Sequence, residues 1–87
     1  MTLIHFTATR AERICGPHRA EVAEAARQLG TTVVECDFDS GSGLVRQHRP
    51  MNVPAVAIDG KPGSLVVGAA PAETLVQRLR PFLGSTP

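Results

Sequence analysis

The stretch Ile14-Cys15-Gly16-Pro17-His18 places a cysteine between a run of strand-forming residues and a run with helical spacing. Before it, residues 2–8 (TLIHFTA) are rich in β-formers and predict a first strand. After it, apolar residues recur at helical spacing as far as Gly30, which can take the left-handed conformation that ends helices; they are Ala20, Val22, Ala23, Ala26 and Leu29. Because proline suits the first turn of a helix, the pattern predicts a helix that opens at Pro17, directly after Cys15.

The rest of the chain continues the alternation of strands and helices. We expect a strand over 31–38, a short helix over 44–48, strands over 53–58 and 64–67, and a final helix that opens near Pro71. Asp59-Gly60 is a strong hairpin signal, and Lys61-Pro62-Gly63 is expected to lengthen that loop. The order β-α-β-α-β-β-α predicts an α/β fold with a four-stranded mixed sheet flanked by helices, with parallel crossovers and one antiparallel hairpin. At 87 residues, we expect a single domain over 1–87.

Composition excludes several classes of function. A formal net charge of +1 gives no basic face for nucleic acid, and three aromatic residues, all Phe, make a base-stacking platform hard to build. The sequence has no apolar run of membrane-spanning length, and its N-terminus lacks the pattern of a secretory signal. Two cysteines do not make a disulfide framework, so we expect a reducing, cytoplasmic setting. Heavy use of Ala, Arg, Gly and Pro is typical of a GC-rich bacterial genome.

Cys15 is the residue on which a chemical function would depend. A cysteine at the start of a helix lies among free backbone N–H groups and at the positive end of the helix dipole. Both favour the thiolate, which is the attacking species in disulfide exchange. Arg10, Arg13 and Arg19 are near in sequence and would act in the same direction. The alternative is an inert, buried cysteine that behaves as a small apolar residue.

The sequence resembles the thioredoxin-like superfamily from Leu3 to Leu83. Cys15-Gly16-Pro17 followed by a helix is similar to the thioredoxin motif Cys-Gly-Pro-Cys, with His18 in the last place. The similarity continues through Val53-Pro54, the Asp59-Gly60 hairpin, Val67-Gly68-Ala69 and the closing amphipathic helix. The leading strand and helix of full-length thioredoxins are absent, so the size is closer to that of glutaredoxins.

The resemblance implies roles for particular residues. Cys15 would be the nucleophile, and Val53 and Pro54, with a cis bond between them, would present a backbone edge to a bound disulfide or peptide. Gly16 and Pro17 would complete this substrate-binding surface.

Four departures from the family pattern narrow the expected chemistry. His18 replaces the resolving cysteine, Ile14 replaces the usual tryptophan, and His5 stands for a buried acid, either as a proton relay or as a packed residue. Of the residues with which glutaredoxins hold glutathione, only Gly68 is present. We therefore expect no cofactor, with a low-molecular-weight thiol at most as an external reductant.

His18 admits three functional interpretations beside that of an exposed polar residue. As imidazolium it would stabilise the Cys15 thiolate from three residues away on the helix, and as neutral imidazole it would move protons. As a metal ligand it would need His5, Cys36 and His48 to converge with Cys15, because zinc takes three or four protein ligands. We expect no metal.

Two further residues have structural and functional alternatives. Alternation in the second strand puts Cys36 on the face of Val34 and Phe38, which predicts a buried structural cysteine; its functional alternative is a resolving thiol for Cys15. Met51 lies beside the Val53-Pro54 edge, where it would either line a contact surface or fill a packing gap.

Two functional hypotheses follow. The first is a monothiol redox protein, in which Cys15 forms mixed disulfides with partner proteins or small thiols. The second is a non-catalytic binding module that keeps the fold and presents a partner surface near Met51, Val53 and Pro54. A Cys15–Cys36 redox pair is a third possibility. In each case we expect a monomer that binds neither nucleic acid nor membrane.

Overall fold

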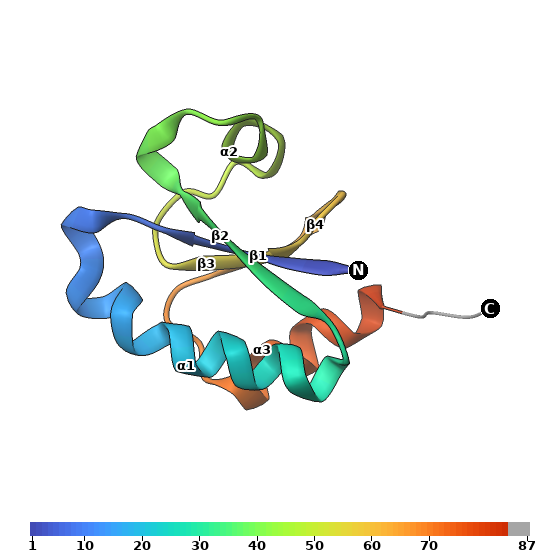
Figure 1. The fold of residues 1–87 in the computed structure, drawn as a ribbon. Coiled ribbons are helices and arrows are strands. Elements are labelled where there is room, and N and C mark those ends of the chain that lie inside the picture. The colour runs from blue at the N-terminus through green and yellow to red at the C-terminus, as the bar shows by residue number, and fades with distance from the viewer. Residues whose placement is uncertain (84–87) are drawn as a thin grey trace.

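A four-stranded sheet in the order β2-β1-β3-β4 organises the chain in the computed structural model, which describes residues 1–83 (Figure 1). The elements are β1 (Thr2–Thr7), α1 (Glu12–Leu29), β2 (Thr32–Asp37), α2 (Gly43–His48), β3 (Ala55–Ile58), β4 (Lys61–Val67) and α3 (Ala72–Leu79). Short 3₁₀ turns occupy Thr9–Ala11, Phe38–Ser40 and Arg80–Phe82. This is the element order that the sequence predicts; the last four positions of the expected domain, 84–87, lie outside the described residues.

Strand directions correct one expectation. β1 and β2 run parallel, as a helical crossover requires, but β3 runs antiparallel to β1 as well as to β4. The reason is the length of α2, whose six residues pass over the face of the sheet opposite to α1 and α3 (Figure 1) without returning the chain from the end at which β2 finishes. The chain therefore enters β3 at that end and runs back alongside β1.

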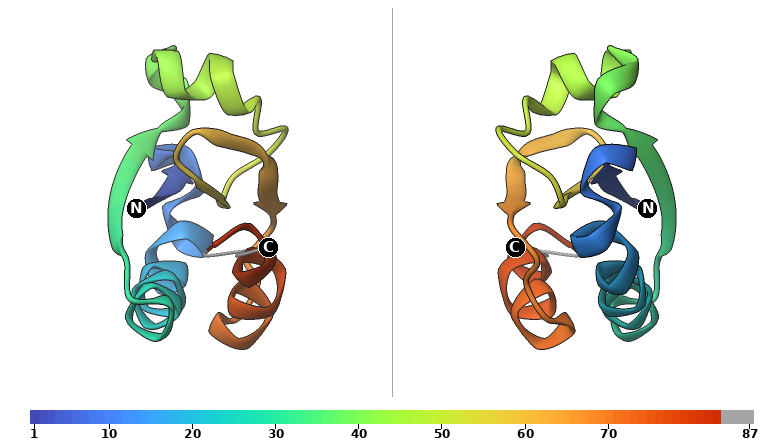
Figure 2. Two further views of the ribbon diagram at one scale, coloured as in Figure 1. Left: turned by 90° about the vertical axis from the view of Figure 1, so that its right-hand side faces the viewer. Right: turned by 90° about the vertical axis from the view of Figure 1, so that its left-hand side faces the viewer.

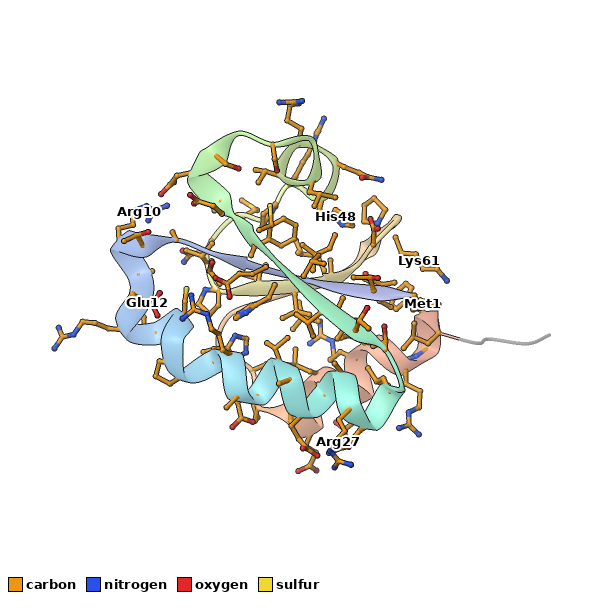
Figure 3. All side chains as sticks on the ribbon, in the orientation of Figure 1. Met1, Arg10, Glu12, Arg27, His48 and Lys61 are labelled. Atoms are coloured by element: carbon orange, nitrogen blue, oxygen red, sulfur yellow. The ribbon has the colours of Figure 1, made fainter. Side chains whose placement is uncertain are left out.

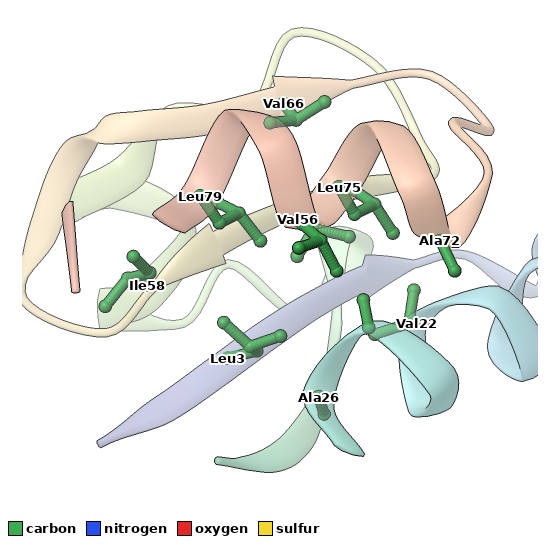
Figure 4. Packing of buried hydrophobic residues seen from close by; sticks show 11 residues of the cluster. Leu3, Val22, Ala26, Val56, Ile58, Val66, Ala72, Leu75 and Leu79 are labelled. Carbon is green, nitrogen blue, oxygen red and sulfur yellow. The ribbon is translucent and has the colours of Figure 1, made fainter. Parts of the chain in front are cut away.

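Helix α2 covers one face of the sheet, and helices α1 and α3 lie side by side on the other face (Figure 2). Their apolar sides meet the sheet in a core whose largest members come from both helices and three strands: Leu3, Val22, Val56, Ile58, Val66, Leu75 and Leu79 (Figure 4). Removing apolar surface of this kind from water supplies the main free energy of folding. In the described part of the chain, no helix has the length and apolar character needed to cross a membrane.

A second apolar cluster lies on the opposite face of the sheet, beneath α2. Its buried members are Ile4, Phe6, Ala8, Cys15, Cys36, Val53, Ala55 and Ala57. Alternation along β1 explains the division, because Leu3 points toward α1 and α3 whereas Ile4 and Phe6 point the other way.

Two local expectations are wrong. Lys61 pairs directly with Ile58, so Lys61-Pro62-Gly63 belongs to β4 and the hairpin turn is the short Asp59-Gly60. The burial of Cys36 is confirmed, but Val34 on the same face is 45% exposed. β2 is an edge strand, and the short α2 does not extend over its first half (Figure 1).

Candidate functional site

Helix α1 begins earlier than the sequence predicts, and this changes the setting of Cys15. The helix starts at Glu12 with Ala11 as its N-cap, so Pro17 lies inside the helix and Cys15 is its fourth residue. The carbonyl of an N-cap accepts the first intrahelical bond, so the free N–H groups of the helix start lie before Cys15. The place at which the resemblance expects the attacking thiol is held by Ala11.

Burial of Cys15 follows from the helical period. The residues of α1 that are buried are Cys15, His18, Val22, Ala25 and Ala26, which recur at intervals of three and four along one face. Cys15 has no exposed surface and packs in the second cluster with Phe6 and Val53. Cys36 is a member of the same cluster, and both cysteines are free thiols.

A chain of two hydrogen bonds runs from β1 through His18 to the loop between β4 and α3. His18 is 2% exposed, which excludes the interpretation of an exposed polar residue. Its Nε2–H donates to the Ala70 carbonyl at 2.8 Å, because a carbonyl can only accept. In the neutral ring Nδ1 then carries no proton and accepts from His5 Nε2–H at 3.1 Å. The tautomers of His5 and His18 are therefore complementary, because Nε2 of His5 carries the proton that Nδ1 of His18 accepts.

His5 is held neutral in this chain. It is 1% exposed, and burial, followed by the neighbouring His18, lowers the pKa of His5 from 6.5 to about 4. The nearby carboxylate of Glu35 acts in the opposite direction but is itself hydrogen-bonded to Arg19 and Thr7. At neutral pH His5 is therefore an uncharged donor.

The loop between β4 and α3 is fixed from three sides. Besides the His18 bond, the Ala72 N–H donates to Glu21 Oε1 at 2.7 Å, and the Gly68 N–H donates to the Pro54 carbonyl at 2.8 Å. The Val53–Pro54 peptide bond is cis, as the family resemblance implies. The first turns of α1, the cis-proline loop and the β4–α3 loop thus converge at one end of the molecule.

A surface hollow of about 310 Å³ opens between α1 and the β4–α3 loop. It is lined by Arg13, Ile14, Pro17, His18, Glu21 and Ala69. Ile14 is 54% exposed although it is a large apolar residue, and an exposed apolar side chain beside a hollow is typical of a surface that contacts a partner. On the separate loop that leads into Pro54, Met51 is 89% exposed.

The predicted site residues divide into exposed and buried groups. Pro17 is exposed at the hollow and Gly16 is partly exposed, whereas Cys15, His18, Val53 and Pro54 are buried. The predictions from sequence do not include an exposed Ile14. The helical spacing does indicate it, because the buried stripe of the helix runs through Cys15, His18 and Val22 at intervals of three and four residues, and Ile14 lies outside this stripe.

Metal binding finds no support in the described residues. Among residues 1–83, no three His, Cys, Asp or Glu side chains are grouped so that they could hold an ion. His5 and His18 contact each other, but His48 lies against Phe6 on the opposite face of β1, with ring centroids 5.8 Å apart.

The sheet order, the two helices on one face and the cis-proline loop define the thioredoxin fold, which confirms the predicted fold class. Among solved structures, thioredoxin 1 from the thermophilic eubacterium Thermosipho africanus TCF52B is similar to this chain with a TM-score of 0.71. The match covers 95% of this chain and 94% of that one at 14% sequence identity, so it establishes the fold alone. No family model and no curated protein matches the sequence.

Proposed function

We propose that this chain is a non-catalytic thioredoxin-fold protein that binds an extended segment of a partner protein at the cis-proline end of the fold. The observation that carries the proposal is the contrast between two neighbours in α1. Cys15 has no exposed surface, whereas Ile14 is half exposed beside a hollow. A partner can therefore contact the apolar side chain of Ile14 at this surface but cannot reach the Cys15 thiol.

The site is preorganised for binding. His18 and Glu21 tie α1 to the β4–α3 loop, and the Gly68–Pro54 hydrogen bond ties that loop to the cis proline. A surface that is already rigid loses little conformational entropy when it binds. Ile14 and Ala69 supply apolar contacts in the hollow, which Arg13 and Glu21 also line, and Met51 is a further exposed apolar side chain on the cis-proline loop.

A backbone edge contributes the directional part of recognition. The family resemblance implies that Val53 presents its backbone to a bound segment, and main-chain hydrogen bonds of this kind give affinity in strand addition. The Val53 N–H donates to Asn52 Oδ1 at 2.9 Å in the free protein. The segment must therefore displace this side chain in order to use that donor.

Peptide selection tests the proposal without a known partner. Twelve-residue peptides displayed on phage are selected against the protein under reducing conditions, and their affinities are measured by fluorescence anisotropy. We expect Ile14→Asp to weaken binding at least tenfold, while Cys15→Ala has little effect. Gln77→Asp, an exposed change on α3, is the matched control. Peptides whose binding requires Cys15, or is unaffected by Ile14→Asp, would overturn the proposal.

Monothiol exchange through Cys15 is the second candidate function, and the packing of Cys15 with Val53 favours it. The Cys15 thiolate would attack a disulfide, form a new S–S bond with one half and release the other half as a thiolate. That thiolate would take a proton from solvent. A low-molecular-weight thiol would then release Cys15 by a second exchange. Each step first requires Cys15 Sγ to become exposed.

Reduction of a small disulfide separates the two candidates. Hydroxyethyl disulfide is supplied as substrate with glutathione as the external thiol, and the protein is compared with its Cys15→Ser variant. Binding without catalysis predicts equal, background rates for both. A rate that depends on Cys15 would establish the monothiol mechanism.

A further inference from the structure

His48 is a buried histidine that the proposed function does not use. It is the last residue of α2 and is 3% exposed, on the side of α2 that faces the sheet (Figure 3). Its ring lies against Phe6 with centroids 5.8 Å apart. Within residues 1–83, neither ring nitrogen has a hydrogen-bond partner. A buried polar group left unpaired costs free energy, so its presence calls for an explanation.

The position of His48 in the chain offers an explanation for its burial without a hydrogen-bond partner among the described residues. Arg49, directly after it, takes a left-handed conformation with φ 51° and closes α2 through its N–H, which donates to the Val45 carbonyl at 2.8 Å. Residues 50–54 then lead through Met51 to the cis proline. The His48 ring therefore packs the end of α2, where the proposed partner-binding loop begins, against the apolar cluster beneath it.

We propose that His48 is an acid-sensitive anchor, which holds α2 and residues 49–54 against the sheet while neutral and lets them open when it is protonated. The consequence for partner binding rests on the proposed function, but the opening itself does not.

The surroundings of His48 disfavour its charged form. β1 presents Phe6, an apolar ring, and the charged side chain that acts on His48 from the sheet is Asp59 in the β3–β4 turn. Within α2, Arg46 donates to the Gly41 carbonyl at the other end of the helix, and Arg49 is exposed. Burial lowers the pKa of His48, and Asp59 opposes this effect. Protonation is thus easier in the open state, where water solvates the ring.

Linkage sets the size of the expected response. An open-state histidine titrates near pH 6.5, so each pH unit below this value raises the open population up to tenfold. Between pH 7 and pH 5, the protection of amides in this segment should fall by up to about 25-fold. Amides of α1 report global unfolding, which exposes His5 as well as His48, so their protection should start higher and fall by a larger factor.

Hydrogen exchange with mass spectrometry tests the proposal on the full chain. Protection of residues 44–52 is compared with that of residues 22–29 at pH 7 and pH 5, after correction for intrinsic exchange rates. In His48→Leu, which keeps an apolar anchor, α1 should still lose protection at pH 5 because His5 titrates, whereas the loss of protection in residues 44–52 should disappear. Gln47→Leu, an exposed change on the same helix, should retain it.

Two results would overturn the anchor. Residues 44–52 could have the same protection as α1 at both pH values, which would mean that this segment opens only when the protein unfolds globally. Alternatively, His48→Leu could show the same loss of protection in residues 44–52 as the parent, which would assign the sensitivity to another group. Neither result depends on peptide binding, so failure here leaves the proposed function to its own test.

Discussion

His18 accepts a hydrogen bond from His5 across a 3.1 Å gap between Nδ1 and Nε2, and both rings are buried. Because His18 also donates to Ala70, the pair joins the central strand to the loop that borders the hollow. While both rings are neutral, this hydrogen-bonded histidine pair holds β1 and the β4–α3 loop together. Its failure in acid should therefore be visible in stability.

Acid should destabilise the protein before its carboxylates titrate. The folded pKa of His5 is about 4, below its unfolded value of 6.5, so the folded state disfavours the proton. The stability contributed by neutral His5 is complete above pH 6.5 and is lost as the pH falls toward 4. Denaturant titrations should show a loss of about 2 kcal/mol between pH 6.5 and pH 4.5. A free energy of unfolding that stays constant between pH 6.5 and pH 4.5 would contradict the lowered pKa of His5.

His5→Leu should destabilise the protein at pH 7. The change leaves the buried Nδ1 of His18 without its donor, at a cost of about 1–3 kcal/mol. The same change should flatten the pH dependence above, because the titrating group is gone. Urea denaturation at pH 7 and pH 4.5 measures both effects. An unchanged stability at pH 7 would show that the hydrogen bond contributes little.

His48→Leu should have the opposite effect at pH 7. Here the substitution removes two buried nitrogen atoms that have no partner in residues 1–83, and the apolar side chain suits the cluster around Phe6. We expect a gain of about 1–2 kcal/mol in the free energy of unfolding. The two histidine variants form a matched pair, because both replace a buried ring with leucine. A loss of stability like that of His5→Leu would mean that His48 is hydrogen-bonded in solution.

Asn52→Ala should tighten the binding of selected peptides. The change frees the Val53 N–H from the Asn52 side chain, so a bound segment no longer has to displace it. We expect about a fivefold gain in affinity, which corresponds to about 1 kcal/mol. Asn52→Asp keeps the acceptor and should leave the affinity near that of the parent. Equal affinities for the alanine and aspartate variants would remove Val53 from the recognition edge.

Much of the fold could be predicted from local signals that survive in the structure. Gly30 ends α1 with φ 69°, and Asp59-Gly60 forms the hairpin turn. Each depends on the backbone preferences of one or two residues, which sequence reports directly. The cis bond before Pro54, by contrast, follows only from the family resemblance.

The start of α1 could not be predicted in the same way. Ala11 is a weak N-cap and offers no side-chain hydrogen bond, while Pro17 resembles a helix start although it lies inside the helix. The 3₁₀ turn Thr9–Ala11 leads straight into α1, so the helix gains residues without a sequence boundary. This difference moves Cys15 from the helix start into the core. The exposure of Val34 likewise depends on the reach of α2, which is a tertiary property.

The alkylation rate of Cys15 tests the proposed non-catalytic function most directly. The measurement uses a Cys36→Ala background, with iodoacetamide at pH 8, and compares the native protein with the same protein unfolded in urea. Native alkylation should be at least a hundredfold slower than in the unfolded chain, because the Cys15 thiol has no exposed surface. A native rate equal to or faster than the unfolded one would mean an accessible, activated thiolate, and would contradict the non-catalytic function.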